Sequence, residues 1–159
     1  DHVVVGRDAP ILDGARLGDP GLGSAVDPQG RRRLFPHFER VRIADRAVIG
    51  TNTVIQRGAL NPTTIGERTH ISANCMIGHN CRIGANVHLA AGAVLGGSAK
   101  LGDWCFIGLG CCIRDGVELA QGVTVGMNAT VARSCLEPNA TLMAQPAREL
   151  GGMFGAKRG

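Results

Sequence analysis

A repeat of six residues runs through most of the chain and constrains its fold more than any other feature. From Ile65 to Val131 every sixth residue is aliphatic, and the series continues upstream of a slip at residues 61–64. A short fixed period predicts a solenoid whose repeats stack on one another. An α-helix is excluded because its period is 3.6 residues and it tolerates recurring glycine poorly. The fifteen hexads begin at Ile43, Ile49, Ile55, Ile65, Ile71, Ile77, Ile83, Leu89, Leu95, Leu101, Ile107, Ile113, Leu119, Val125 and Val131.

The other positions of the hexad are also restricted. The second residue is Gly, Ala or Ser in thirteen of the fifteen hexads, and the fourth is Gly or Asn in ten. Gly and Asn adopt a left-handed backbone at the least cost, so the fourth position predicts a corner. Three short strands and three corners then make a triangular coil of about 18 residues. The sequence predicts an all-β, left-handed parallel β-helix of about five or more coils over residues 43–136. We expect an irregular cap with a decayed coil over 1–42 and a short extension over 137–159.

Composition agrees with a stack of small layers, because aromatic residues make up only 3% of the chain and Gly numbers 24. Five of the six cysteines occupy the small fifth position, which predicts buried apolar fillers rather than disulfides or zinc ligands. Unpaired buried thiols favour a reducing compartment and therefore predict a cytoplasmic protein. No apolar run is long enough for a membrane span, and we expect no signal peptide.

The charge pattern bears on partners. The formal net charge is +4, and basic residues cluster at Arg31, Arg32 and Arg33. Such a cluster suits a phosphate-bearing or acidic partner, although solvated surface charge explains it equally well. The scarcity of aromatic residues argues against a nucleic-acid partner.

Residues 18 apart should stack in columns along the outside of the solenoid. One column is apolar, so we expect a partner to bury it. A cyclic homotrimer would bury the column between subunits. The members of this column are Ala73, Ala91, Leu109 and Met127, flanked by Met76, Val94 and Cys112. A second column contains His79, Gly97, Asp115 and Arg133. We expect it near a subunit boundary, where clefts commonly bind ligands.

Several segments resemble the hexapeptide-repeat acyltransferases, and most closely the UDP-3-O-acylglucosamine N-acyltransferases. The resemblance covers about residues 23–148. Its specific parts are the stretch from Phe35 to Phe38, the Arg57-Gly58-Ala59-Leu60 segment, and Ile77-Gly78-His79-Asn80. The stretch from His79 to Gly97 is also similar to sialic acid O-acetyltransferases and UDP-amino-sugar N-acetyltransferases.

The resemblance implies an enzyme that transfers an acyl group from a thioester to the amine of an amino sugar. His79 would be the general base, and the Gly97 N–H would stabilise the oxyanion. The donor is acyl-CoA or an acyl carrier protein, and no permanently bound cofactor or metal is expected. We predict donor contacts by His88, Gly96, Ser98, Lys100, Arg133 and Arg148, and an interface or acyl groove formed by Leu109, Met127, Met76 and Val94.

The sequence also departs from these families. The carboxylate that orients the base falls at Ser72, and a later histidine falls at Gly116. Two alternatives therefore stay open: an acetyl-CoA-dependent sugar acetyltransferase, and a trimeric binding or assembly module without catalysis. A zinc site made by His79, His88 and His70 across an interface is a further, less favoured alternative.

Overall fold

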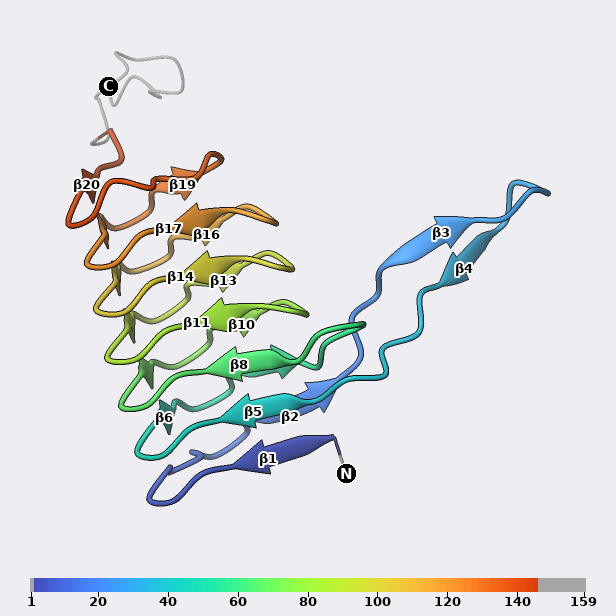
Figure 1. Cartoon of the computed structure of the whole chain (residues 1–159), viewed down its shortest axis with the longest axis horizontal. Coiled ribbons are helices and arrows are strands. Elements are labelled where there is room, and N and C mark those ends of the chain that lie inside the picture. Colours follow the sequence, from blue (N-terminus) through green and yellow to red (C-terminus); the bar gives the residue numbers. More distant parts are fainter. Residues whose placement is uncertain (1, 146–159) are drawn as a thin grey trace, which may run out of the picture.

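The computed structural model describes residues 2–145, which form a left-handed triangular β-solenoid with a projecting arm (Figure 1). Three six-stranded parallel sheets form its faces, here named A, B and C in the order in which the chain visits them. Face A contains β1 (Val3–Val5), β5 (Val41–Ile43), β8 (Thr63–Ile65), β11 (Arg82–Ile83), β14 (Lys100–Leu101) and β17 (Glu118–Leu119). Face B contains β6 (Val48–Ile49), β9 (His70–Ile71), β12 (His88–Leu89), β15 (Phe106–Ile107), β18 (Thr124–Val125) and β20 (Thr141–Leu142). Face C contains β2 (Arg16–Asp19), β7 (Val54–Gln56), β10 (Met76–Ile77), β13 (Val94–Leu95), β16 (Cys112–Ile113) and β19 (Thr130–Val131).

The strand register confirms the predicted stacking period. Met76 pairs with Val94 on face C, and Lys100 pairs with Glu118 on face A, each 18 residues along the chain. Successive coils are therefore one sheet spacing apart, about 4.8 Å. All fifteen hexad heads are buried and form one continuous hydrophobic core.

The fourth position of the hexad adopts a left-handed backbone in thirteen of the fifteen hexads, the exceptions being Gly58 and Ser134. Asn80 has a φ of 62° and Gly92 a φ of 73°, both in the left-handed region. Trp104 occupies the same position with a φ of 64° and is 62% exposed. A bulky side chain is unusual in this conformation, which otherwise favours Gly and Asn.

The inward cysteines do more than fill space. The Cys81 thiol donates to the carbonyl oxygen of Gly96 at 3.2 Å, and the Cys105 thiol donates to Ala120 at 3.1 Å. The hydroxyl of Thr69, in the same hexad position, donates to Gly84 at 2.7 Å. Each of these bonds spans 15 residues and joins a corner to the coil above it. The fifth position thus selects small side chains, and its Cys and Thr members also act as hydrogen-bond donors to backbone carbonyls.

Burial of these thiols makes stability depend on pH. Desolvation raises the pKa of Cys81 from 9.0 to about 11. Between these values the unfolded chain loses a proton that the folded chain keeps, so the free energy of unfolding falls as pH rises. The loss from Cys81 alone is about 2–3 kcal/mol across the window. Denaturant titrations from pH 8 to 11 should show this decline. Cys81→Ala should make it shallower, although burial also raises the pKa values of Cys75 and Cys105. Cys112→Ala, at an exposed thiol, should not make it shallower.

The first coil lies upstream of the regular hexads. β1 pairs with β5, Ile11 bridges to Ile49, and β2 pairs with β7, so residues 3–19 form a coil beneath the repeat, with one register shift between Leu17 and Asp19. At the other end β20 pairs with β18. Domain boundaries at 42/43 and 136/137 stay predictions. No helix in the range 2–145 is long and apolar enough to cross a membrane.

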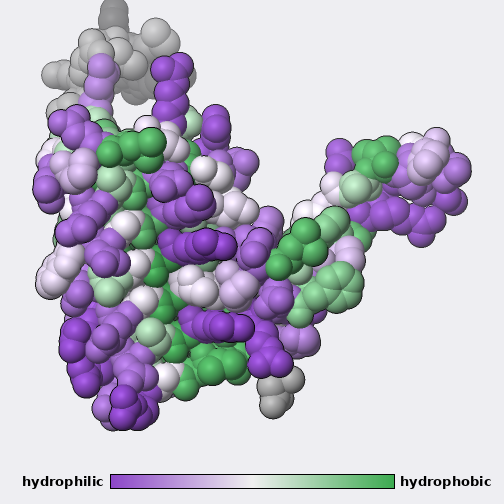
Figure 2. Space-filling view, in the orientation of Figure 1, coloured by the Kyte–Doolittle hydropathy of each residue, from purple (hydrophilic) through white to green (hydrophobic). Residues whose placement is uncertain are grey.

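Residues 20–40 leave the solenoid as the arm, which contains the antiparallel hairpin β3 (Ser24–Val26) and β4 (Arg32–Leu34) (Figure 1). Apolar and polar side chains are both exposed along it (Figure 2). Asp27 accepts hydrogen bonds from the guanidinium groups of Arg31 and Arg33, which pair it with two of the three clustered arginines. The arm occupies the corner between face C and face A, here called the C–A corner.

Candidate active site at the C–A corner

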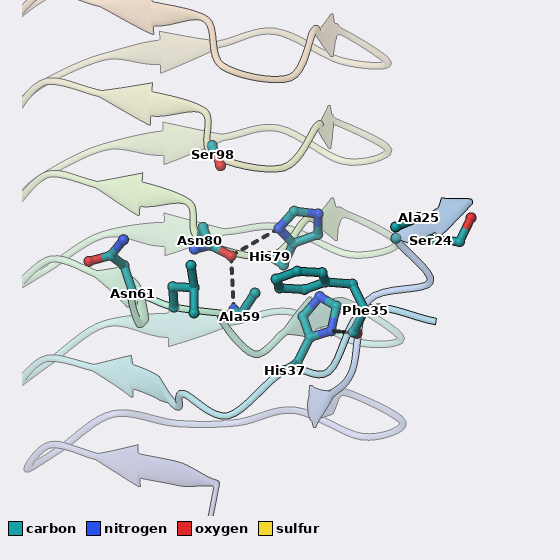
Figure 3. Close-up of a pocket in the computed structure, with 11 residues that line it drawn as sticks. Ser24, Ala25, Phe35, His37, Ala59, Asn61, His79, Asn80 and Ser98 are labelled. Atoms are coloured by element: carbon teal, nitrogen blue, oxygen red, sulfur yellow. Dashed lines mark hydrogen bonds between the residues drawn. The ribbon is translucent and has the colours of Figure 1, made fainter. Parts of the chain in front are cut away.

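Three segments meet at the C–A corner and line an open cavity of about 340 Å³ (Figure 3). The arm supplies one wall, and the widened corner at residues 57–62 supplies the second. The third wall is formed by the corners of the next two coils. The lining residues are Gly23, Ser24, Ala25, Phe35, His37, Ala59, Leu60, Asn61, His79, Asn80 and Ser98.

His79 is held in one orientation and one tautomer by Asn80. The Asn80 Oδ1 accepts the backbone N–H of Ala59 at 2.9 Å, so an oxygen must lie at this position. The same oxygen lies 2.9 Å from His79 Nδ1, which must therefore carry a proton and donate it (Figure 3). The neutral ring then has its lone pair on Nε2. That nitrogen is the one available to accept a proton.

Gly97 lies directly above the His79 ring, one coil along the solenoid. The Ser98 N–H donates to the His79 carbonyl oxygen at 2.8 Å, which holds the two corners together. A Cβ added to Gly97 would lie 2.6 Å from His79 Cε1 and 2.7 Å from His79 Nε2. The absence of a side chain at Gly97 is therefore what leaves room for the ring.

The N–H of Gly97 has no backbone or side-chain acceptor among residues 2–145. A free N–H close to a basic nitrogen is the pair of groups that an acyl-transfer site requires. The base removes the proton of the attacking group, and the N–H donates to the oxyanion that develops on the attacked carbonyl.

Asn80 is a site residue that sequence reasoning missed. An asparagine is expected at this corner because of the left-handed backbone alone. Nothing in the sequence pattern therefore indicated that its amide contacts His79. Asn80 supplies the acceptor for the proton on His79 Nδ1.

Removing that amide should lower activity. Asn80→Gly keeps the left-handed corner but deletes the acceptor of the His79 Nδ1 proton, so the reactive tautomer is no longer favoured. We expect kcat/KM for thioester consumption to fall about 10- to 100-fold. Asn74→Gly, at a corner with a similar φ of 58°, is the matched control and should stay within twofold of the wild type. Equal activity of both variants would remove Asn80 from the site.

The arm contributes a second histidine, His37, to which the sequence pattern assigns no role. His37 is only 5% exposed, and its ring packs edge-on against His79 with centroids 5.1 Å apart. Its Nδ1 lies 2.9 Å from the Phe35 carbonyl oxygen. The guanidinium of Arg57 donates to the His37 carbonyl oxygen at 3.0 Å and so ties the arm to the second coil.

The residues predicted to bind the donor do not all gather here. Gly96 and Ser98 adjoin Gly97, and Ser98 lines the cavity. His88 lies on face B, where its ring stacks on Phe106 with centroids 5.2 Å apart. Lys100 lies on face A and forms an ion pair with Glu118 at 3.1 Å.

Other predicted residues lie farther from the cavity. Arg133 occupies the same column as His79 but two coils above Gly97, about 10 Å along the solenoid, and lines a separate cavity. Arg148 lies outside the described residues. The predicted acyl groove splits between face C, with Met76 and Val94, and the corner between faces B and C, with Leu109 and Met127. Leu109 and Met127 are 52% and 63% exposed. Residues 2–145 contain no group of three or more His, Cys, Asp or Glu side chains suited to a metal ion.

Sequence models of two repeat families match the chain. The bacterial transferase hexapeptide of six repeats matches residues 62–97, and the hexapeptide repeat of succinyl-transferase matches 40–78 and 98–133. The UDP-3-O-acylglucosamine N-acyltransferase of Caulobacter vibrioides is 38% identical over 81 residues, covering 47% of this chain and 24% of the relative. The enzyme of the same name from Rhizobium johnstonii is 41% identical over 75 residues, covering 47% and 21%. The chain thus spans about a quarter of the length of these curated relatives.

Solved structures share the fold. The UDP-N-acetylglucosamine acyltransferase of Francisella novicida superposes with a TM-score of 0.81 at 22% identity, covering 91% of this chain and 50% of that one. A variant of the perosamine N-acetyltransferase of Caulobacter crescentus, solved with CoA and GDP-perosamine, superposes with a TM-score of 0.50 at 22% identity, covering 94% and 58%. The repeat matches, which together run from residue 40 to 133, and the observed solenoid identify this chain as a hexapeptide-repeat protein.

Proposed function

We propose that this chain transfers an acyl group from a thioester to the amine of an amino sugar, with the C–A corner as its active site. The observation that carries the proposal is the pairing of a histidine lone pair, on His79 Nε2, with a free N–H one coil above it, on Gly97. The names of the curated relatives support the reaction class, and the bound CoA and GDP-perosamine of one structural neighbour suggest the kinds of donor and acceptor.

The reaction follows from these two groups. The acceptor amine attacks the thioester carbonyl carbon while His79 Nε2 takes its proton. The carbonyl oxygen becomes an oxyanion that accepts the Gly97 N–H. When the intermediate collapses, the carbon–sulfur bond breaks and His79 returns the proton to the leaving thiolate. The products are an amide and a free thiol on CoA or on an acyl carrier protein.

A homotrimer would complete the site. The exposed Leu109 and Met127 mark an apolar edge that a second copy would cover. Within one chain His88 lies on face B and His79 at the C–A corner, so a cleft between two copies is where both would contact one donor. The donor roles of His88, Lys100, Arg133 and Arg148, and a cytoplasmic location, belong to this proposal as predictions.

The test is release of free thiol in the presence of candidate amino sugars. Purified protein is incubated with acetyl-CoA, a longer acyl-CoA or an acylated carrier protein, together with UDP- or GDP-linked amino sugars. Thiol release should depend on the acceptor, and mass spectrometry should detect the acylated sugar. Turnover with acetyl-CoA alone would identify an acetyltransferase. No turnover with any donor and acceptor would favour a trimeric binding module and contradict the proposal.

A further inference from the structure

The arm histidine His37 has a fixed tautomer. Its Nδ1 lies 2.9 Å from the Phe35 carbonyl oxygen, which can only accept, so Nδ1 carries the proton. A proton on Nε2 as well would place an unpaired charge in a residue that is 5% exposed. In the neutral ring the lone pair is therefore on Nε2.

That lone pair is buried without a partner. Nε2 of His37 has no hydrogen-bond partner among the described residues. An unpaired buried acceptor costs about 1–3 kcal/mol, which calls for an explanation.

The position of His37 Nε2 explains why this acceptor is kept unpaired. A Cβ added to Gly21 would lie 2.7 Å from His37 Nε2 and 2.9 Å from His79 Cδ2, so both atoms converge over the same small residue. Figure 3 shows the second ring nitrogen of His37 on the side nearer His79. The rings meet edge-on at 74°. The negative end of the His37 dipole thus faces the ring edge of His79.

We propose that His37 is a positioning residue that acts through His79, because its Nε2 lone pair favours the positive charge that His79 gains on accepting the acceptor's proton. A fixed dipole near a developing charge stabilises it without reorganisation. The arm is then part of the active site. Moving the arm away from the corner would remove the dipole that stabilises the charged form of His79. This inference rests on the proposed function and adds a second imidazole to it.

The tautomer is tested in the wild-type protein by nitrogen-15 NMR of the histidine rings at neutral pH. His37 should show a protonated Nδ1 and an unprotonated Nε2, because the Phe35 carbonyl requires it. A protonated Nε2 on His37 would overturn the inference irrespective of any activity.

Three variants test the kinetic role. His37→Phe keeps the ring and lacks both nitrogens, and should lower kcat about tenfold while the acceptor KM stays within about twofold. His37→Gln places a polar atom near the position of Nε2 and should restore most of kcat. His37→Asn retains a polar group near the position of Nδ1 only and should resemble the Phe variant.

The outcomes distinguish a failure of this inference about His37 from a failure of the proposed acyl-transfer function. No turnover by the wild type overturns both. Wild-type turnover with an unchanged kcat in His37→Phe overturns the role of His37 alone. A rise in acceptor KM with kcat unchanged would assign His37 to substrate binding and would also overturn it.

Discussion

Gly97→Ala should abolish acyl transfer while leaving the solenoid folded. The added Cβ would lie 2.7 Å from His79 Nε2, closer than atoms pack, so the ring must move or the variant must distort locally. The base is displaced and the space beside the Gly97 N–H is filled. Because misplacement of a reacting group by 1 Å costs about 100-fold in rate, we expect kcat/KM to fall at least that far.

The backbone of Gly97 does not itself require glycine, since its φ is not among the positive values. The melting temperature should therefore change little. Gly23→Ala is the matched control because Gly23 lines the same cavity and a Cβ there meets nothing within 4 Å. Full activity in Gly97→Ala would show that this close approach has no part in the reaction.

His79→Asn should reduce kcat by about 100- to 10,000-fold, the usual contribution of a general base. The asparagine amide can replace the ring Nδ1 in its contact with Asn80, so the local structure is retained. It has no basic nitrogen at the position of Nε2, so the acceptor's proton has no recipient.

The variant should still bind the donor, which isothermal titration with CoA would measure alongside the rate of thiol release. His2→Asn, an exposed histidine near the N-terminus, controls for nonspecific effects. If His79→Asn kept more than a tenth of the wild-type rate, another residue would have to be the base.

The period of six was sufficient to predict most of the solenoid and the centre of the candidate site. Because 18 residues make one coil, His79 and Gly97 had to be neighbours, and the structure places them in contact. The same period placed Lys100 beside Glu118, where their ion pair forms. That pairing, visible in the column of polar residues, weakens the prediction that Lys100 contacts the donor.

The parts of the site that interrupt the repeat could not be predicted in this way. The arm and the widened corner at 57–62 have no periodic pattern, so nothing in the sequence positions His37 or Ala59 relative to the coils. Both insertions lie at the C–A corner, and together they line the cavity. The role of Asn80 was hidden because its corner conformation alone accounts for an asparagine there.

The central claim is that stacking of successive coils brings a basic nitrogen and a free N–H to one thioester. A crystal structure with a nonhydrolysable ketone analogue of acyl-CoA tests it most directly. The analogue's carbonyl oxygen should lie about 3 Å from the Gly97 nitrogen, with His79 Nε2 facing the carbonyl carbon. An analogue bound with its carbonyl beyond the reach of both residues would contradict the account.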